Sequence, residues 1–449
     1  MSGSADRTVV VVGAGLVGSL LACYLGRRGY TVAVHERRPD PRSAEVERGR
    51  SINLAISERG IDALRRIDLL DTVMAPALPM HGRMLHDRDG QLTYQSYSAR
   101  GDRAINSISR ASLNETLINA AESTPGVTLH FDQRLVDYDL ATNTLAFESG
   151  GATHHVTADV VLGADGGGSA LRKVLEATGR VQVTIDALDS DYKELTIPPS
   201  GGTFAMDPDA LHIWPRGSSM MIALPNPDHS FTCTLFWPRD AVPNFGSLTT
   251  SGQILDHFLA EYPDAVPLMP TLVEDFLANP VGTLGTIHSD PWQADGKVAL
   301  IGDAAHGILP FFGQGANCGF EDVVELDACL DEVDDDWALA LPMYQERRRP
   351  NAEAIAQLAK ENFVEMRDKV NSRTFQLGRR FEHALEKVMP GTYLSRYEMV
   401  SFTTIPYAEV IERANRQHQV VLAGLAAGAV GVLGAATAVV RRVVGRGGS

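Results

Sequence analysis

Cysteine is scarce in this chain of 449 residues, which contains four of them, at positions 23, 233, 318 and 329. They form no CxxC pair and no tight cluster, and the sequence has no HExxH run or similar set of metal ligands. The sequence therefore predicts neither a disulfide framework nor a metal site. This pattern suits a reducing compartment, and the polar start leads directly into a strand, so we expect a cytoplasmic protein without a cleaved signal.

Positive charge is also in short supply, because 40 Lys and Arg against 56 Asp and Glu give a net charge of -16. A surface with this balance repels phosphate groups, so nucleic acid is not an expected partner, and small neutral or zwitterionic ligands fit better. The sequence lacks a GxSxG or Cys/His signature of a catalytic nucleophile, and we assign no catalytic side chain. The length and a hydrophobic content of 44% predict a globular protein of two or three domains with a large core.

Uncharged runs of membrane-spanning length are absent until residues 420–440, a stretch rich in Ala and Gly that precedes Arg441 and Arg442. This stretch is long enough to span a bilayer, and Gly424 and Gly428 have a spacing that lets helices approach closely in lipid. Ala and Gly are weak insertion signals, so a buried Ala-rich helix and a disordered end are the alternatives. Membrane attachment is thus one of two open expectations, and the sequence indicates no oligomeric state.

The motif GAGLVG, residues 13–18, separates two β-branched apolar runs, Thr8–Val12 and Thr31–His35. This order predicts a strand, a tight turn, a helix and a second parallel strand that ends before Glu36. In such a unit Gly13 permits the turn, Gly15 lets a pyrophosphate approach the backbone, and Gly18 lets helix and strand pack closely. Glu36 would accept hydrogen bonds from ribose hydroxyls. The unit predicts a dinucleotide site, for which NAD and FAD are equally suitable.

Two later motifs favour FAD. The first, VVLGADGGGSALR at residues 160–172, is an apolar strand that ends in Asp165 and continues to Ser169 and Arg172. In the second, residues 297–322, Asp303 ends a strand and can bond a ribityl hydroxyl, although it is also a plausible helix cap. A helix should begin near Gly315, where the backbone N–H groups of Gly315, Ala316 and Asn317 can stabilise negative charge at the flavin N1–C2 carbonyl region.

The rest of the pattern predicts an α/β fold with a Rossmann-like FAD-binding domain. We assign residues 1–180 and 281–335 to this discontinuous domain, and 181–280 to an inserted antiparallel-sheet substrate domain, because both parities of residues 192–240 carry apolar side chains. Residues 336–415 should form a helical C-terminal part and 416–449 a hydrophobic tail. The acidic run at 331–336 is interpreted as a solvated connection.

The order GxGxxG, DGxxSxxR and GDAAH resembles the single-component aromatic hydroxylases that use FAD and NADPH. The resemblance implies a tightly but noncovalently held FAD and an NADPH that binds transiently, with Asp165 and Arg172 as candidates to assist NADPH. It does not locate the NADPH groove. It also implies further FAD contacts, from Val17, Arg37, Arg38, Ala55, Arg110 and Leu135.

Within that family the chain is most similar to the kynurenine 3-monooxygenases. The similarity rests on segments dispersed over most of the chain: RSINLAIS at 50–57, HGRMLHD at 81–87, YKELTIPP at 192–199, LHIWPR at 211–216, PFFGQGANCGFED at 310–322, ENFVEMRD at 361–368 and YEMVSFTTIPY at 397–407. It implies hydroxylation of L-kynurenine beside its aniline nitrogen, by O2 that adds to reduced flavin as a C4a-hydroperoxide, in tryptophan degradation. Ala316 departs from the family, where a bulkier Met is common.

The resemblance also implies a substrate site. Arg83 would bind the carboxylate through two charge-assisted hydrogen bonds, with Tyr97, Tyr397 and Asn362 as further polar contacts. Phe236, Phe312 and Gln314 would line the ring, with Ile222, Leu224 and Phe311 as further wall residues. For each of these positions the alternative is ordinary packing or a surface ion pair.

Rival interpretations remain open. One is a hydroxylase of another aromatic acid, and another is a membrane-tethered flavoprotein that hydroxylates nothing. A flavin halogenase is disfavoured because no WxWxIP run is present.

Overall fold

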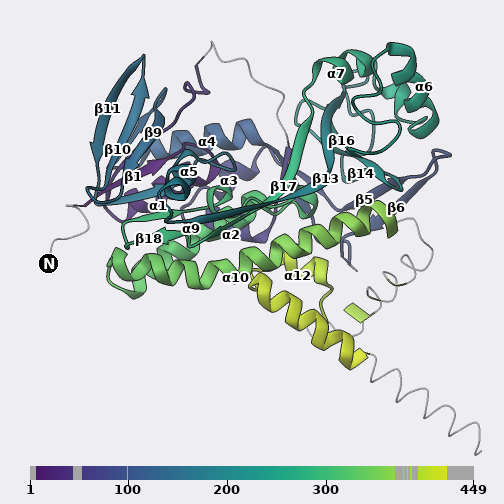
Figure 1. Ribbon diagram of the computed structural model, residues 1–449. Coiled ribbons are helices and arrows are strands. Elements are labelled where there is room, and N and C mark those ends of the chain that lie inside the picture. Colours follow the sequence, from purple (N-terminus) through teal and green to yellow (C-terminus); the bar gives the residue numbers. More distant parts are fainter. Residues whose placement is uncertain are drawn as a thin grey trace, which may run out of the picture.

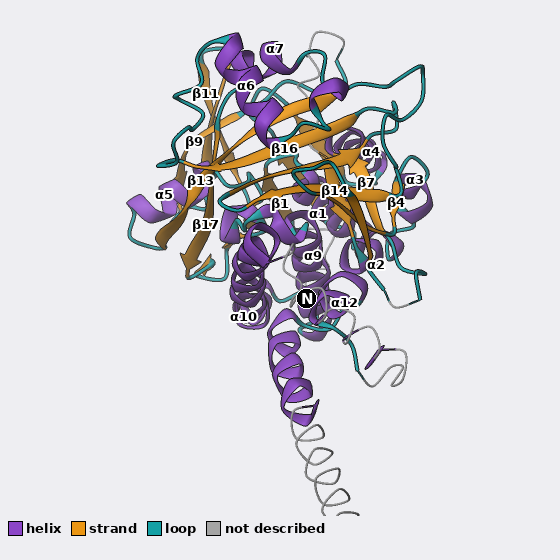
Figure 2. Cartoon of the chain, turned by 90° about the vertical axis from the view of Figure 1, so that its right-hand side faces the viewer, coloured by secondary structure: helices purple, strands orange, loops and turns teal. Residues whose placement is uncertain are grey.

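The computed structural model describes residues 7–43, 53–98, 100–369 and 393–421, together with positions 378, 382, 385 and 386. Figure 1 shows two sheet-containing bodies side by side, with the long helix α10 (Trp337–Val364) running along both. Figure 2, seen from the side, shows the strands gathered above a layer of helices that includes α9 (Gly315–Glu332) and α10.

The first body is built on a six-stranded sheet. Its order is β18 (Gln293–Ala294), β19 (Val298–Leu300), β12 (Val160–Gly163), β1 (Thr8–Val12), β2 (Thr31–His35) and β8 (Val127–His130). The pairs from β19 to β8 are parallel, and the inner strands β19, β12 and β1 are buried on both faces and read as continuous apolar runs, whereas β8 at the edge is partly exposed. The predicted βαβ unit is confirmed, with α1 (Leu16–Arg27) between β1 and β2.

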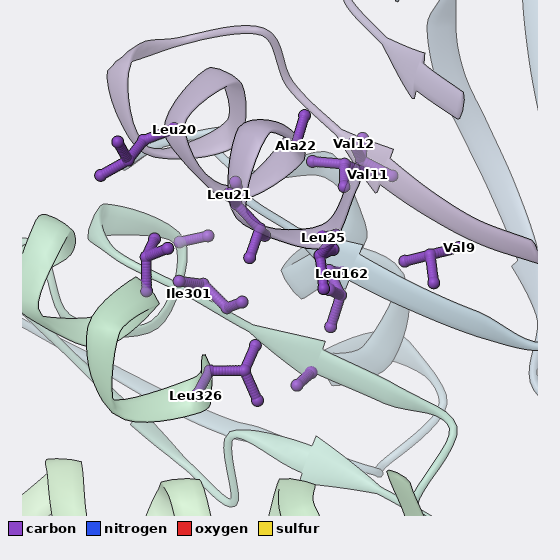
Figure 3. Close-up of a cluster of buried hydrophobic side chains, with 14 of the residues drawn as sticks. Val9, Val11, Val12, Leu20, Leu21, Ala22, Leu25, Leu162, Ile301 and Leu326 are labelled. Atoms are coloured by element: carbon purple, nitrogen blue, oxygen red, sulfur yellow. The ribbon is translucent and has the colours of Figure 1, made fainter. Parts of the chain in front are cut away.

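Helices α1 and α9 pack together against this sheet. Figure 3 shows Leu21 and Leu25 of α1 meeting Leu162, Ile301 and Leu326, which come from three distant parts of the sequence. These side chains are at most 2% exposed. Helix α4 (Arg110–Ser123) packs beside α1, with Leu113, Leu117 and Ile118 buried.

Smaller elements flank the first body. One three-stranded sheet comprises β9 (Arg134–Asp139), β10 (Thr144–Ser149) and β11 (Ala152–Thr157), and another comprises β3 (Asn53–Ile56), β7 (Ile105–Ser109) and β4 (Leu78–Met80). The short helices are α2 (Glu58–Arg65), α3 (Leu70–Met74), α5 (Ala170–Ala177) and α8 (Asp303–His306).

A seven-stranded sheet forms the second body. Its order is β17 (Gly282–Asp290), β13 (Gln182–Ile197), β16 (Phe231–Pro238), β15 (Ser219–Pro225), β14 (Ala210–Arg216), β5 (Gly82–His86) and β6 (Leu92–Ser96). Strands β5 and β6 come from residues 1–180, which we assigned to the FAD-binding domain. They pair within the seven-stranded sheet instead, so the second body includes chain from both predicted domains. The domain boundaries themselves stay a prediction.

Both faces of this sheet are covered, as predicted from the apolar side chains at both alternating sets of positions in residues 192–240. One face carries Ile213, Met220 and Phe236 in a cluster with the 3₁₀ turn η3 (Pro310–Phe312) and α10. The other carries Trp214, Met221 and Leu235 beneath α6 (Ser251–Glu261), η2 (Val266–Leu268) and α7 (Leu272–Ala278).

The C-terminal elements lie beneath the junction of the two bodies. Helix α10 continues into the π-helical turn η4 (Glu365–Lys369), and later come α12 (Arg396–Phe402) and a helix over 407–421. None of the helices within the described residues is long and apolar enough to cross a membrane. Residues 422–440 of the predicted membrane segment lie outside the described part of the chain.

Residues 331–336 end α9 and connect it to α10, and most of them are exposed, as expected for a solvated connection, but the run also has a structural role. Arg28 at the end of α1 donates to the carboxylates of Asp327, Asp331 and Asp335 at 2.7 to 2.9 Å. Asp336 caps α10 by accepting from the N–H of Ala338. These three carboxylates at the end of α9 therefore tie this helix to α1, because they surround a half-buried arginine from a remote part of the sequence.

Candidate active site

The glycine turn after β1 has the geometry that a dinucleotide requires. Gly13 has a φ of +103°, and a side chain there would meet the Ala164 carbonyl oxygen at 2.7 Å. At Gly18 an added Cβ would lie 2.0 Å from the Gly13 carbonyl oxygen, which explains why helix and strand can pack so closely. At Gly15 an added Cβ would meet no described protein atom within 4 Å, so the backbone there is open to a phosphate.

Glu36 stands at the end of β2, as predicted. Its carboxylate accepts from the N–H of Ala14 at 2.9 Å and from the N–H of Arg38 at 3.0 Å, which fixes it against the glycine turn. Arg37 and Arg38 are exposed beside it. Leu135 of β9 is buried in the core, so little of its side chain can contact a ligand.

The Asp303 turn lies against the same glycine helix. Gly302 and Gly319 both pack on Val17, and a Cβ at either position would clash with its methyl groups. Asp303 keeps an exposed surface, yet desolvation by the surrounding protein raises the pKa of its carboxyl, an effect that His306 and Arg110 partly offset. Three predicted cofactor residues, Val17, Arg110 and Asp303, are thus brought together.

The DG segment holds this turn in place. Asp165 accepts from the hydroxyl of Ser169 at 2.5 Å and from the N–H of Ala170 at 2.6 Å, and so caps α5. Arg172 is buried and donates to the Ala304 carbonyl at 2.8 Å and to the Gly167 carbonyl. Arg172 is therefore a structural link to the Asp303 turn, and Asp165 holds the start of α5, while their role toward NADPH stays a prediction.

The start of α9 lies where the sequence predicts it, with Gln314 as the N-cap residue. The N–H groups of Gly315, Ala316 and Asn317 fall in the first turn, where a helix has no acceptors of its own to offer. The Asn317 side chain donates to the carbonyls of Ala55 and Gly313 at 2.7 and 2.8 Å and so ties β3 to this turn.

Gln314 does not fit the predicted substrate role. Its Oε1 accepts from the Tyr407 hydroxyl at 2.8 Å, and its Nε2 donates to Ser57 at 3.2 Å. The side chain is 1% exposed. Gln314 therefore joins the flavin-side turn to the C-terminal helix and to α2, and its polar atoms already have protein partners.

A buried ionic network supports the turn from below. His306 Nε2 lies 2.6 Å from Asp322 Oδ2, which also accepts from the N–H of Gly302 at 2.9 Å. Arg348 donates to the other Asp322 oxygen at 2.7 Å and to Glu321 at 2.6 Å. Burial opposes the charge on His306, but Asp322 more than offsets this and raises the pKa of His306. Asp322 is therefore a structural partner of this histidine.

Arg83 lies deep in the second cluster, between two phenol rings. Its guanidinium carbon is 4.8 Å from the centre of the Tyr397 ring and 5.7 Å from that of Tyr97, and these rings stack at 5.0 Å. Arg83 is 6% exposed. Among the described residues, neither the Arg83 Nε nor the Tyr97 hydroxyl has a hydrogen-bond partner. Arg83 and Tyr97 therefore bring two buried donors close together, and both can donate hydrogen bonds to a carboxylate.

An aromatic wall adjoins this pair. Phe312 stacks on Tyr397 at 5.6 Å, and Phe311 contacts Phe236 at 4.9 Å and Phe363 at 4.2 Å. Asn362 is buried and donates to the Phe311 carbonyl at 2.7 Å, so it holds the turn that carries both phenylalanines. The structure thus brings together six predicted residues from five elements and the loop after β6: Arg83, Tyr97, Tyr397, Phe236, Phe312 and Asn362.

Several residues near the site were missed from the sequence. Phe363 follows Asn362, and Phe402 lies 6.5 Å from Tyr97 and 6.3 Å from Tyr397. Glu365 is close enough to Arg83 to favour its charged form. All three lie in the quoted segments 361–368 and 397–407, and no spacing rule distinguishes them from helix packing residues.

Comparisons with known proteins agree with this geometry. Residues 6–243 and 255–359 match the family described as FAD binding domain, which confirms the predicted cofactor. The chain is 47% identical over 410 residues to a kynurenine 3-monooxygenase of Myxococcus xanthus, covering 91% of this chain and 88% of that one. A kynurenine 3-monooxygenase of Dictyostelium discoideum is 41% identical over 427 residues, 92% of each chain.

Solved structures show the same fold. The tetrameric form of 2-methyl-3-hydroxypyridine-5-carboxylic acid oxygenase matches with a TM-score of 0.66 at 22% identity, over 83% of this chain and 96% of that one. PqsL of Pseudomonas aeruginosa also matches with a TM-score of 0.66 at 22% identity, over 84% and 99%. Relatives at more than 40% identity over most of the chain carry the assignment further: the chain belongs to the kynurenine 3-monooxygenase family of FAD-dependent monooxygenases.

Proposed function

We propose that this protein hydroxylates L-kynurenine to 3-hydroxykynurenine with O2, using FAD as the resident cofactor and NADPH as the reductant. One observation carries the choice of substrate. A buried arginine and a buried phenol, Arg83 and Tyr97, keep polar atoms that meet no partner within the described residues. Leaving such groups unpaired costs about 1 to 3 kcal/mol each, which a ligand carboxylate would recover.

The charge on Arg83 is maintained. Burial alone disfavours a guanidinium, but Tyr397, Tyr97 and Glu365 outweigh that effect and the pKa of Arg83 is raised. A permanently charged planar fork between two phenols matches an amino acid carboxylate in shape and charge. The adjoining wall of Phe236, Phe311 and Phe312 suits the aniline ring at the other end of kynurenine.

The FAD residues fit the cofactor at both ends. Gly15 leaves the backbone open for the pyrophosphate, Glu36 is held at the ribose position, and Asp303 and the first turn of α9 are placed for the ribityl chain and the flavin. When bound, FAD supplies hydride acceptance from NADPH and the activation of O2.

The protein's own tasks are binding, orientation and exclusion of water. Arg83 and the two tyrosines hold the carboxylate, and the phenylalanine wall aims the ring at the flavin side of the turn Pro310–Phe312. The buried residues of this wall also keep water from the reacting centre, so that reduced oxygen is used on the substrate ring and not lost as hydrogen peroxide.

Replacing Arg83 tests this assignment. Arg83→Ala should raise the KM for kynurenine about 100-fold, because a buried charge-assisted pair is lost, while FAD content stays as in the wild type. The decarboxylated analogue of kynurenine, which has an amine but no carboxylate, should be used equally by both enzymes. An Arg83→Ala enzyme with unchanged kinetics toward kynurenine would overturn the substrate assignment.

A further inference from the structure

The strand that carries Arg83 has a second buried polar cluster on its opposite face. Side chains alternate along β5, so Arg83 and Leu85 face the substrate cluster, whereas His86 faces the other way. The His86 ring stacks on Trp214 at 4.0 Å, beneath η2 and α6. His86 and its neighbour His212 are 4% and 2% exposed. The proposed chemistry uses neither histidine.

A continuous chain of hydrogen bonds passes through both rings. His86 Nδ1 lies 2.6 Å from Asp264 Oδ2, His86 Nε2 lies 2.7 Å from His212 Nδ1, and His212 Nε2 lies 2.8 Å from the Asp207 carbonyl. A carbonyl can only accept, so His212 carries its proton on Nε2. Burial lowers the pKa of His212 to about 4, so its Nδ1 is unprotonated and must accept from His86.

The other end of the chain is fixed by Trp214. Its indole N–H, which can only donate, reaches both oxygens of Asp264 at 3.0 and 3.1 Å. Burial would raise the pKa of Asp264, but the hydrogen bonds from His86 and Trp214 outweigh it and lower the pKa. Asp264 therefore holds the His86 ring from its Nδ1 side, while His212 holds it from its Nε2 side.

We propose that His86, hydrogen-bonded between Asp264 and His212, is a positioning residue that fixes β5 so that Arg83 meets the substrate carboxylate. The role of Arg83 rests on the proposed function. The chain of hydrogen bonds does not, since its contacts lie between atoms of the protein.

The pairing of β5 shows why such a lock is needed. It joins β14 in parallel through four residue pairs, from Gly82 with Ala210 to Leu85 with Ile213. Its partner strand lies far along the chain, and Arg216 at the end of that strand, 130 positions after His86, donates to the His86 carbonyl at 2.9 Å. A short pairing between remote segments tolerates slippage unless side chains fix it, and a slip of about 1 Å at a binding group can lower activity about 100-fold.

The chain of hydrogen bonds is tested first, on the wild-type holoenzyme without substrate. Protein labelled with ¹⁵N-histidine should show a scalar coupling across the hydrogen bond between His86 Nε2 and His212 Nδ1, and this coupling should vanish in His86→Gln. A wild type without the coupling would overturn the proposal, whether or not the enzyme hydroxylates kynurenine.

The positioning role is tested with Asp264→Asn, which keeps the shape of the side chain but removes its charge. We expect the KM for kynurenine to rise about 10- to 100-fold with little change in kcat or FAD content. The decarboxylated analogue should show no change, because it does not use Arg83. Asp256→Asn on the exposed side of α6 is the matched control and should leave both substrates unaffected.

Each kinetic outcome decides one point. An Asp264→Asn enzyme that loses both substrates equally, or neither, would refute positioning through Arg83. If the wild type turns over no kynurenine, the proposed function fails, while the ¹⁵N coupling still decides whether His86 and His212 are joined by a hydrogen bond.

Discussion

His35 is a buried imidazole at the end of β2, next to the predicted ribose ligand. Among the described residues, neither of its nitrogens has a hydrogen-bond partner, and its ring stacks on Phe147 at 4.1 Å and on His130 at 4.7 Å. Burial, with smaller contributions from His130 and His154, lowers its pKa to about 3. The ring therefore acts as a neutral flat packing group whose protonation is unfavourable in the folded state.

This predicts a loss of stability in acid. Between pH 6.5 and pH 3 the unfolded chain binds a proton at His35 that the folded chain does not, so stability falls as the pH falls through this window. From pH 6.5 to pH 5 the loss from one such histidine is about 1.5 kcal/mol. His35→Leu should reduce the acid sensitivity, measured as the difference in urea midpoint between pH 7 and pH 5. His155→Gln, at an exposed position on β11, is the control, and an unchanged pH dependence in His35→Leu would contradict the prediction.

At the scale of elements, the DG segment has a consequence for cofactor binding. Arg172 of α5 donates to carbonyls of the Asp303 turn and of the glycine run before it, so it joins two motifs that are 131 positions apart. Arg172→Met should weaken FAD binding at least about tenfold, because hydrogen bonds from a charged donor are lost at buried carbonyls. Fluorescence titration of the apoprotein with FAD measures this.

The control for that variant is Lys173→Met, an exposed neighbour on the same helix. If Arg172→Met instead shows normal FAD affinity and only a raised KM for NADPH, the result would support a role of the DG segment in NADPH binding.

The helices and strands could be predicted from the sequence, but some of their pairings could not. The strand–turn–helix motifs were predicted nearly residue by residue, since β-branched runs and glycine turns are local signals. The pairing of β5 with β14 was not predicted, because nothing local in HGRMLHD names a partner strand. Arg83, Tyr97 and Tyr397 converge as the family resemblance implies, but Gln314 did not, because a buried amide binds the nearest protein partners.

At the scale of the whole molecule, one buried arginine links the C-terminal elements to the cofactor body. Arg59 of α2 is 1% exposed and donates to the carbonyls of Val400 and Ile405. It pairs with Glu321 at 3.0 Å and lies 3.7 Å from the centre of the Tyr407 ring. Tyr397 of the substrate site is therefore held in place from the far side of α12.

Arg59→Met should release this part of the chain while the FAD body stays folded. We expect faster hydrogen–deuterium exchange in residues 396–411, measured by mass spectrometry, and a raised KM for kynurenine because Tyr397 is no longer fixed. Arg65→Met, on the exposed side of the same helix, is the matched control. Unchanged exchange in the Arg59 variant would show that the C-terminal elements are held by other contacts.

The central claim is that the convergent Arg83 site and the FAD body together make a kynurenine hydroxylase. The most direct measurement uses the purified FAD-loaded protein with NADPH, O2 and kynurenine, and follows NADPH consumption, 3-hydroxykynurenine and hydrogen peroxide together, with anthranilate and 4-hydroxybenzoate as comparison substrates. The account predicts that NADPH consumption is stimulated by kynurenine and yields 3-hydroxykynurenine in near-equal amount. Peroxide as the sole product, or hydroxylation of a comparison acid in preference to kynurenine, would contradict it.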